Sequence, residues 1–198
     1  MKYGYKTVWV PVLFLTLGIT LSQLNLSWLS AKHAAAIPAR YINGTNPALS
    51  FRQDTLLFKG QRYTGYVFTL FANNDTAAIL GYTNGLQEGI SRLWYPNKQK
   101  REERLYIAGK KEGIHKGWWP NGKLQFMFEV SHDENTGYFK TWHPDGKPER
   151  IFHYQNGKEQ GSQKMWWPDG RIRANYVIKD GEKFGMLGQK ICINKDVN

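Results

Sequence analysis

A period of 24 residues runs through most of the chain and constrains its fold more than any other feature. Glycines keep this interval at Gly65, Gly89, Gly113, Gly137, Gly161 and Gly185. Tryptophans keep it at Trp94, Trp118, Trp142 and Trp166. The units that start at residues 89, 113, 137 and 161 are well formed, the unit at 65 is degenerate and the unit at 185 is partial. The chain is therefore predicted to build one supersecondary unit repeatedly.

Each unit is predicted to be a β-hairpin. The unit that begins at Gly113 reads as a strand "GIHKGWW", a turn "PNG" and a return strand "KLQFMFEV". Proline presets φ for the first turn position, Asn or Asp suits the second, and glycine accepts the left-handed conformation that follows. The predicted turn residues are Pro120, Asn121, Gly122, Pro144, Asp145, Gly146, Pro168, Asp169 and Gly170. A second kind of turn, such as Asn156-Gly157, would join one hairpin to the next.

The predicted fold class is all-β: an elongated single-layer antiparallel β-meander of hairpins, preceded by an N-terminal hydrophobic helix. Residues 51–198 would form the repeat domain, in which no segment shows a 3.6-residue period. Residues 31–50 are rich in Ala, Pro, Asn, Gly and Ser, which is typical of a linker. Residues 1–30 would be a membrane anchor or an uncleaved signal-type helix.

Two interpretations of the N-terminal segment stay open. A secretory signal peptide would end at the small residues Ala34–Ala36. An uncleaved anchor would use Val8–Leu29, which has no charge and is about 33 Å long as a helix, enough to cross a bilayer core. The late position of the cleavage site favours the anchor. Both interpretations place the repeat domain on the extracytoplasmic side, periplasmic or extracellular, and cleavage would make the protein secreted.

The repeated residues resemble the MORN repeat, in the variant found in YwqK-type proteins. The resemblance rests on Gly113, Trp118, Trp119, Asn121 and Gly122, and on a phrase exemplified by Tyr154, Gly157 and Gly161. It covers about residues 58–190. The resemblance implies an elongated, curved single sheet that serves as a protein-interaction or scaffolding module. Some members have been proposed to bind lipid, and YwqK-type members are often labelled antitoxins.

Alternation along a strand divides the repeated side chains between two faces. One face takes Trp94, Trp118, Trp142 and Trp166 together with a basic column, Arg92, Lys116, Lys140 and Lys164. The opposite face takes Tyr95, Trp119, His143 and Trp167. A single-layer sheet has little core, so aromatic residues on at least one face must cover one another. The tryptophan and basic columns are the candidate partner-binding residues. The alternative for the lysines is a solvated face that is repeated by duplication and kept for solubility.

The charge and the titratable residues point to binding and not to catalysis. Against 16 Asp and Glu there are 27 Lys and Arg, an excess that favours acidic partners. The single cysteine, Cys192, excludes an internal disulfide framework and a multi-cysteine metal site. The stretch Ser131–Glu134 gathers polar groups but is predicted to be a turn, and His143 replaces an aromatic residue. We therefore expect no enzyme activity, no cofactor and no metal.

The expected function is that of a protein-interaction or scaffolding subunit of a membrane-associated complex. The expected partner is a protein, with the membrane contacted through the N-terminal helix. The first alternative is a module that binds glycan or anionic lipid, and the second is a YwqK-type antitoxin. Nucleic acid is not an expected partner.

Overall fold

The computed structural model describes residues 36–188, and this part of the chain is built from strands without helices. The predicted helix of residues 1–30 lies outside the described range. Nothing between residues 36 and 188 forms a helix that could span a membrane. The all-β class is confirmed.

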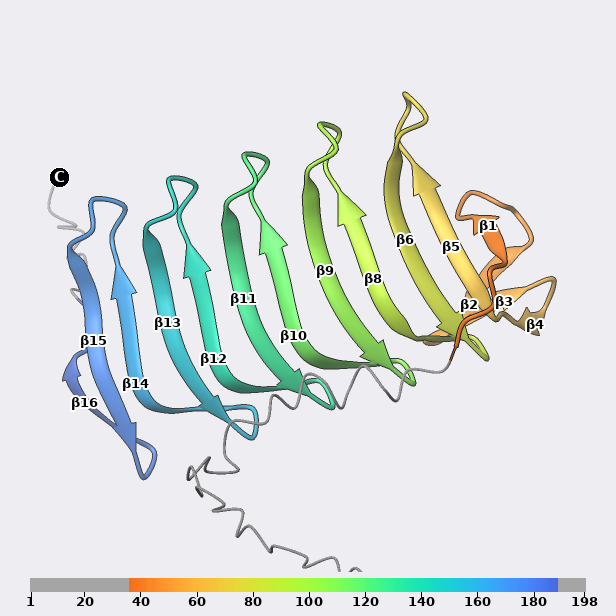
Figure 1. The fold of residues 1–198 in the computed structure, drawn as a ribbon. Coiled ribbons are helices and arrows are strands. Elements are labelled where there is room, and N and C mark those ends of the chain that lie inside the picture. Colours follow the sequence, from red (N-terminus) through yellow and green to blue (C-terminus); the bar gives the residue numbers. More distant parts are fainter. Residues whose placement is uncertain (1–35, 189–198) are drawn as a thin grey trace, which may run out of the picture.

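The main sheet is a long antiparallel meander in which strands adjacent in sequence are neighbours in space (Figure 1). Its hairpin strands are β5 (Gly65–Leu70), β6 (Thr76–Thr83), β8 (Gly89–Trp94), β9 (Lys100–Ile107), β10 (Lys110–Trp118), β11 (Leu124–Ser131), β12 (Glu134–Trp142), β13 (Pro148–Gln155), β14 (Lys158–Trp166), β15 (Ile172–Lys179) and β16 (Glu182–Met186). A short strand, β7 (Leu86–Gln87), pairs with β6 beside the start of β8. Each 24-residue unit therefore contributes one hairpin, as predicted.

The two kinds of predicted turn lie at opposite ends of the hairpins. In the longer turns Gly122, Gly146 and Gly170 have φ values of 80°, 90° and 89°, which is the left-handed conformation expected of them. The amide of Gly122 donates to the carbonyl of Trp119 at 2.8 Å and closes a type I turn. At the other end Asn156 and Gly157 both have positive φ, 51° and 74°, the signature of a type I′ turn.

The glycines that open the units at Gly113, Gly137 and Gly161 sit in β-bulges. Gly113 and Gly161 both have φ of 70°, and the register shifts beside them in the pairs β9–β10 and β13–β14. Bulges bend strands, and Figure 1 shows the strands curving toward the end that carries the two-residue turns. A glycine is needed there because a residue with a Cβ rarely adopts this φ.

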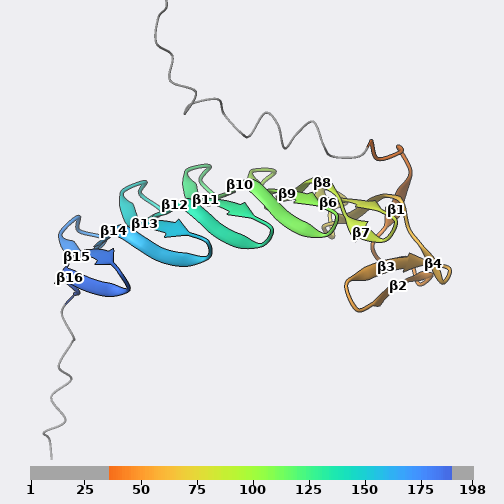
Figure 2. The same cartoon turned by 90° about the horizontal axis from the view of Figure 1, so that it is seen from below.

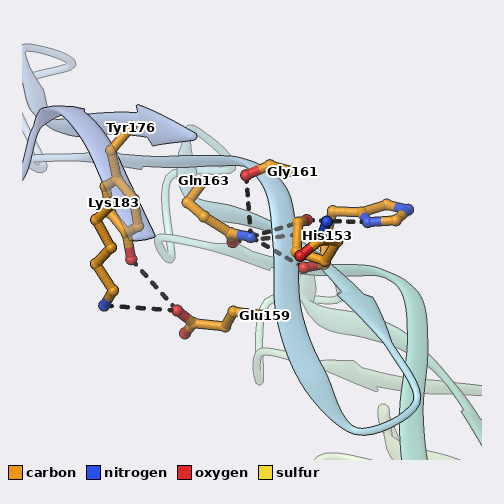
Figure 3. A network of polar contacts seen from close by, with 7 residues as sticks. His153, Glu159, Gly161, Gln163, Tyr176 and Lys183 are labelled. Atoms are coloured by element: carbon orange, nitrogen blue, oxygen red, sulfur yellow. Dashed lines mark hydrogen bonds and ion pairs between the residues drawn. The ribbon is translucent and has the colours of Figure 1, made fainter. Parts of the chain in front are cut away.

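Polar side chains satisfy the backbone groups that the bulges leave unpaired (Figure 3). The buried Gln163 donates from Nε2 to the carbonyls of His153 at 2.9 Å and Gln160 at 3.1 Å, and its Oε1 accepts from the His153 amide at 3.3 Å. His115 holds the equivalent place two units earlier, with Nε2 3.1 Å from the carbonyl oxygen of Leu105.

One face of the main sheet, the inner face, carries the core as a ladder of rings. His115 lies 5.3 Å from Phe128, and Phe128 stacks on Phe139 at 5.1 Å between centroids. Phe152 meets Tyr176 edge to face at 6.3 Å. Because these rings come from successive hairpins, each hairpin covers part of the next. Phenylalanine, tyrosine and histidine thus supply the core that a single layer lacks.

A small second sheet caps the first hairpin (Figure 2). It consists of β2 (Leu49–Arg52), β3 (Thr55–Phe58) and β4 (Gln61–Arg62), and its Leu56 packs with Tyr63 against Val67 and Tyr82. Beside it, β1 (Tyr41–Asn43) joins the main sheet in parallel with β5. The segment expected as a linker, residues 31–50, thus contains β1 and the start of β2. The short apolar runs "YI" and "LSF" between its turn residues explain the difference.

Candidate functional site

The register places the predicted basic column in one row across the sheet. Arg92 lies opposite Glu103, and Glu103 lies opposite Lys116. The same row continues through Met127, Lys140, Ile151, Lys164 and Asn175. Every second strand therefore contributes a cation, and the residues between them are Glu103 or uncharged side chains. We call the side of the sheet that carries this row the outer face.

The predicted tryptophans lie on the same outer face, two residues further along each strand. Trp94, Trp118, Trp142 and Trp166 are half-buried. Each faces the first residue of its return strand, and the opposing residues are Lys100, Leu124, Pro148 and Ile172. The ammonium of Lys100 lies 5.1 Å from the centre of the Trp118 ring, within the range of a cation–π contact.

Exposed apolar side chains of the hairpin strands gather on the outer face. The residues are Leu70, Ile90, Ile114, Tyr138, Ile172, Val177, Phe184 and Met186, each between 40 and 55% exposed. Register and alternation place all of them on the side of the lysines. A run of exposed apolar residues on one face is typical of an interaction surface. The outer face therefore carries the more exposed apolar side chains of the two faces, a point that the sequence left open.

The positive charge of the outer face is uneven. Glu103 forms ion pairs with Arg92 at 3.0 Å and with Lys100 at 2.9 Å. Burial acts to raise the pKa of Glu103, but hydrogen bonds from Lys100 and Arg92 lower it below its usual value. In contrast, Lys116, Lys140 and Lys164, which we call the lysine row, have no carboxylate partner among residues 36–188. The members of the basic column that form no ion pair thus lie on β10, β12 and β14.

The second aromatic column has a structural role. The hydroxyl of Tyr95 donates to the carbonyl of Trp118, and the indole Nε1 of Trp119 donates to the carbonyl of Trp142, each at 3.0 Å. The side chain of Asn121 repeats this link by donating to the carbonyl of Pro144 at 2.8 Å. These bonds tie the turn after β8 to the turn after β10, and the turn after β10 to the turn after β12. The sequence showed the columns, but it carried no signal of their hydrogen bonds.

A hollow of about 300 Å³ lies on the outer face between the first two complete hairpins. Its lining includes Thr76, Ile79 and Trp94, with the ion pair of Lys98 and Asp75 (3.0 Å) at its rim. The hollow exists because the return strand β6 presents the small Thr76 where later units present Leu124 or Ile172.

The titratable residues do not assemble into a reactive group in the part of the chain that the structure describes. No three His, Cys, Asp or Glu side chains of residues 36–188 lie close enough to hold a metal ion. His132 is exposed in a two-residue turn, where His132 and Asp133 have φ of 53° and 72°; Ser131–Glu134 is thus a polar turn, as predicted. Cys192 lies outside the described residues.

The sequence model of the MORN repeat variant matches residues 87–108, 111–129 and 135–156. The chain carries MORN repeats. Each match covers one hairpin, β8–β9, β10–β11 or β12–β13, so one MORN repeat is one hairpin here. MORN repeats are in general modules that interact with proteins or lipids. No curated protein matches the chain, and the narrower YwqK-type resemblance stays a prediction.

Proposed function

We propose that this MORN-repeat protein is a non-enzymatic interaction subunit of a membrane-associated complex, anchored in the membrane or exported, and that its outer face binds a protein partner. The observation that carries the proposal is the lysine row, whose members form no ion pair with another described residue and lie among exposed apolar side chains. A face that is only solvated gains nothing from large apolar side chains such as Ile114, Tyr138 and Phe184, which are exposed to water here. The segregation of core rings to the inner face leaves these residues available for contact.

The two kinds of side chain would contribute differently to binding. Apolar residues such as Ile114 and Tyr138 supply free energy, at about 25 cal/mol per Å² of apolar surface removed from water. The lysines supply orientation and a faster association with an acidic partner more than affinity. Hydrogen-bonded turns and stacked rings hold the side chains in place before binding, which lowers the entropic cost of association.

A second candidate function is binding to an anionic lipid surface. The observation that favours it is the combination of lysine, tryptophan and aliphatic side chains on one face, which is a combination found at membrane interfaces. High salt would weaken such binding strongly because it screens the attraction between lysine and lipid head groups.

The test uses the full chain, purified in mild detergent from the membranes of its own cells. We expect a defined protein to co-purify with the wild type and to be lost from the variant Lys116→Glu/Lys140→Glu/Lys164→Glu. The matched control is Arg62→Glu, which reverses an exposed charge on β4 that makes no ion pair with another described residue. Far-UV circular dichroism checks that each variant keeps its sheet. Equal recovery of the protein with the triple variant would overturn the proposal.

A further inference from the structure

We propose that the segment bound by the outer face is an amphipathic α-helix of the partner protein that carries an acidic residue at every seventh position and lies along the lysine row, across β10–β14. This inference rests on the proposed function, because it specifies the partner of the same face. It follows from the spacing, the width and the charge of that face.

The spacing of the lysines matches a helix. Lys116, Lys140 and Lys164 lie on alternate strands of one cross-strand row, so neighbouring members are about 10 Å apart. Seven residues of α-helix rise about 10.5 Å. An acidic residue at positions i, i+7 and i+14 would therefore meet the three lysines in turn. The stripe drifts by only about 20° per heptad on a straight helix, so it stays on one side over this length.

The width of the face also fits a helix. The lysine row is flanked on one side by Trp118, Trp142 and Trp166 and on the other by Ile114, the exposed Glu129 and Tyr138. Ile114 and Trp118 are four residues apart on β10, about 13 Å along the strand. A helix with its side chains is about 10–12 Å wide and reaches both flanking rows. A single extended chain occupies about 5 Å and would reach only one of them.

The charge of the face locates the helix. At β8 and β9 the carboxylate of Glu103 already pairs with both Arg92 and Lys100, which leaves one net positive charge and a carboxylate that repels an acidic ligand. From β10 onward the lysines alternate with Met127 and Ile151, which gives the row an apolar floor between its charges. The acidic stripe should therefore begin opposite Lys116 and end opposite Lys164.

The same features favour a protein helix over a membrane. A lysine near an anionic bilayer contributes about 1 kcal/mol, so three lysines in a single line give weak membrane attachment. The head groups of a bilayer are mobile, so a fixed lysine spacing of about 10 Å gives no advantage in binding to it. A helix exploits both the spacing and the apolar side chains in the rows on its two flanks.

The test compares two labelled 21-residue peptides of identical composition. In the first, glutamates occupy positions 4, 11 and 18 between flanking leucines. Both peptides also contain glutamines two residues away from the first and third glutamates, on the opposite side of the helix. In the isomer these glutamates and glutamines exchange places, so the acidic stripe is broken. Each is titrated with the full chain in neutral detergent and followed by fluorescence anisotropy and circular dichroism. We expect the striped peptide to bind at least about tenfold more tightly than the isomer and to become helical.

The variants then locate the site. Lys140→Glu should weaken binding of the striped peptide at least about tenfold, whereas Arg92→Gln and Arg62→Glu should change it less than about twofold. Equal affinity of the two peptides, or an equal effect of Arg92→Gln and Lys140→Glu, would overturn the inference. So would failure of both peptides together with lysine-dependent binding to vesicles containing phosphatidylserine.

Failure of the inference can be told from failure of the proposed function. If the native partner still co-purifies and is lost on reversing the lysine row, while the two peptides bind equally, the helix is wrong and the proposed function stands. If the native partner is also indifferent to the lysine row, both are wrong.

Discussion

The indole Nε1 of Trp119 donates a hydrogen bond of 3.0 Å to the carbonyl oxygen of Trp142, one hairpin further along the sheet. Trp167 holds the same position in a later unit, but its indole nitrogen has no hydrogen-bond partner among residues 36–188. The two tryptophans thus have the same place in the repeat and differ in whether they bind a neighbouring turn.

This difference gives a matched pair of variants. Trp119→Phe keeps most of the ring but removes the donor, so we expect a loss of about 1 kcal/mol in the free energy of unfolding beyond that of Trp167→Phe. Urea unfolding of the two variants and the wild type measures it. Equal losses would show that the bond between the turns contributes nothing.

The hydrogen bond from Asn121 to the next long turn predicts a second effect on stability. Its Oδ1 accepts from the Lys123 amide at 3.1 Å, while its Nδ2 donates to the Pro144 carbonyl. Aspartate at this place, as at Asp145, keeps the acceptor inside the turn but has no donor. We expect Asn121→Asp to cost about 1 kcal/mol, measured by urea unfolding at pH 7. The control, Asn121→Ser, keeps an acceptor without adding a charge, and it should lose a similar amount of stability. A loss confined to Asn121→Asp would assign the effect to the added charge and would contradict a contribution from the hydrogen bond to Pro144.

Lys98 should be replaceable by glycine with a gain in stability. It has φ of 67° at the place where later units have Gly122 or Gly146. Relief of the left-handed conformation gains about 1–2 kcal/mol, and the freer unfolded chain offsets about 0.4–1 kcal/mol. The exposed ion pair with Asp75 contributes at most about 1 kcal/mol. We expect Lys98→Gly to raise the urea midpoint by the equivalent of about 0.5 kcal/mol. Lys98→Ala, which keeps the strain and loses the ion pair, should not raise it.

His115 predicts a dependence of stability on pH. Burial lowers the pKa of this imidazole, and the charges of Arg104 and Lys111 act in the same direction against the hydrogen bond to Leu105. The folded protein therefore holds a neutral ring, while the unfolded chain takes up a proton below its ordinary pKa of about 6.5. The contribution of His115 is fully present above this pH and is lost as the pH falls toward the lowered pKa, by at most about 1.4 kcal/mol per pH unit.

The variant His115→Gln isolates this contribution, because Gln163 fills the equivalent bulge without a titratable group. We expect the slope of stability against pH between pH 6.5 and 5 to be smaller in the variant, by equilibrium urea unfolding at several pH values. An unchanged slope would show that His115 does not contribute to the pH dependence.

The sequence predicted the hairpins and turns because their signals are local. Gly122 and Asn156-Gly157 are recognisable from the turn chemistry of a few residues. Burial of one face depends on contacts between hairpins, and alternation alone cannot say which face is covered when both carry aromatic residues. For this reason the sequence could not say whether the face of Trp118 or that of Trp119 holds the core. In the structure the rings of Phe128, Phe139 and Phe152 lie on the face opposite Trp118.

The start of the repeat domain was the hardest part to predict. The small sheet around Leu56 and Tyr63 follows no period, and the parallel pairing of β1 with β5 joins segments more than twenty residues apart. The basic column was found because it repeats every 24 residues. Its division into Arg92, which pairs with Glu103, and a lysine row without ion pairs was not predicted, because Glu103 occurs in only one unit.

The bonds from Trp119 to Trp142 and from Asn121 to Pro144 join groups one hairpin apart, and each hairpin meets only its two neighbours. The length of such an array is therefore set by the number of its repeats. Duplicating one 24-residue unit within it would create no new type of contact, yet would extend the sheet by two strands, about 10 Å, with one more tryptophan and one more cation. Evolution could then adjust the length of the bound segment in fixed steps, by copying a unit, without redesigning the fold.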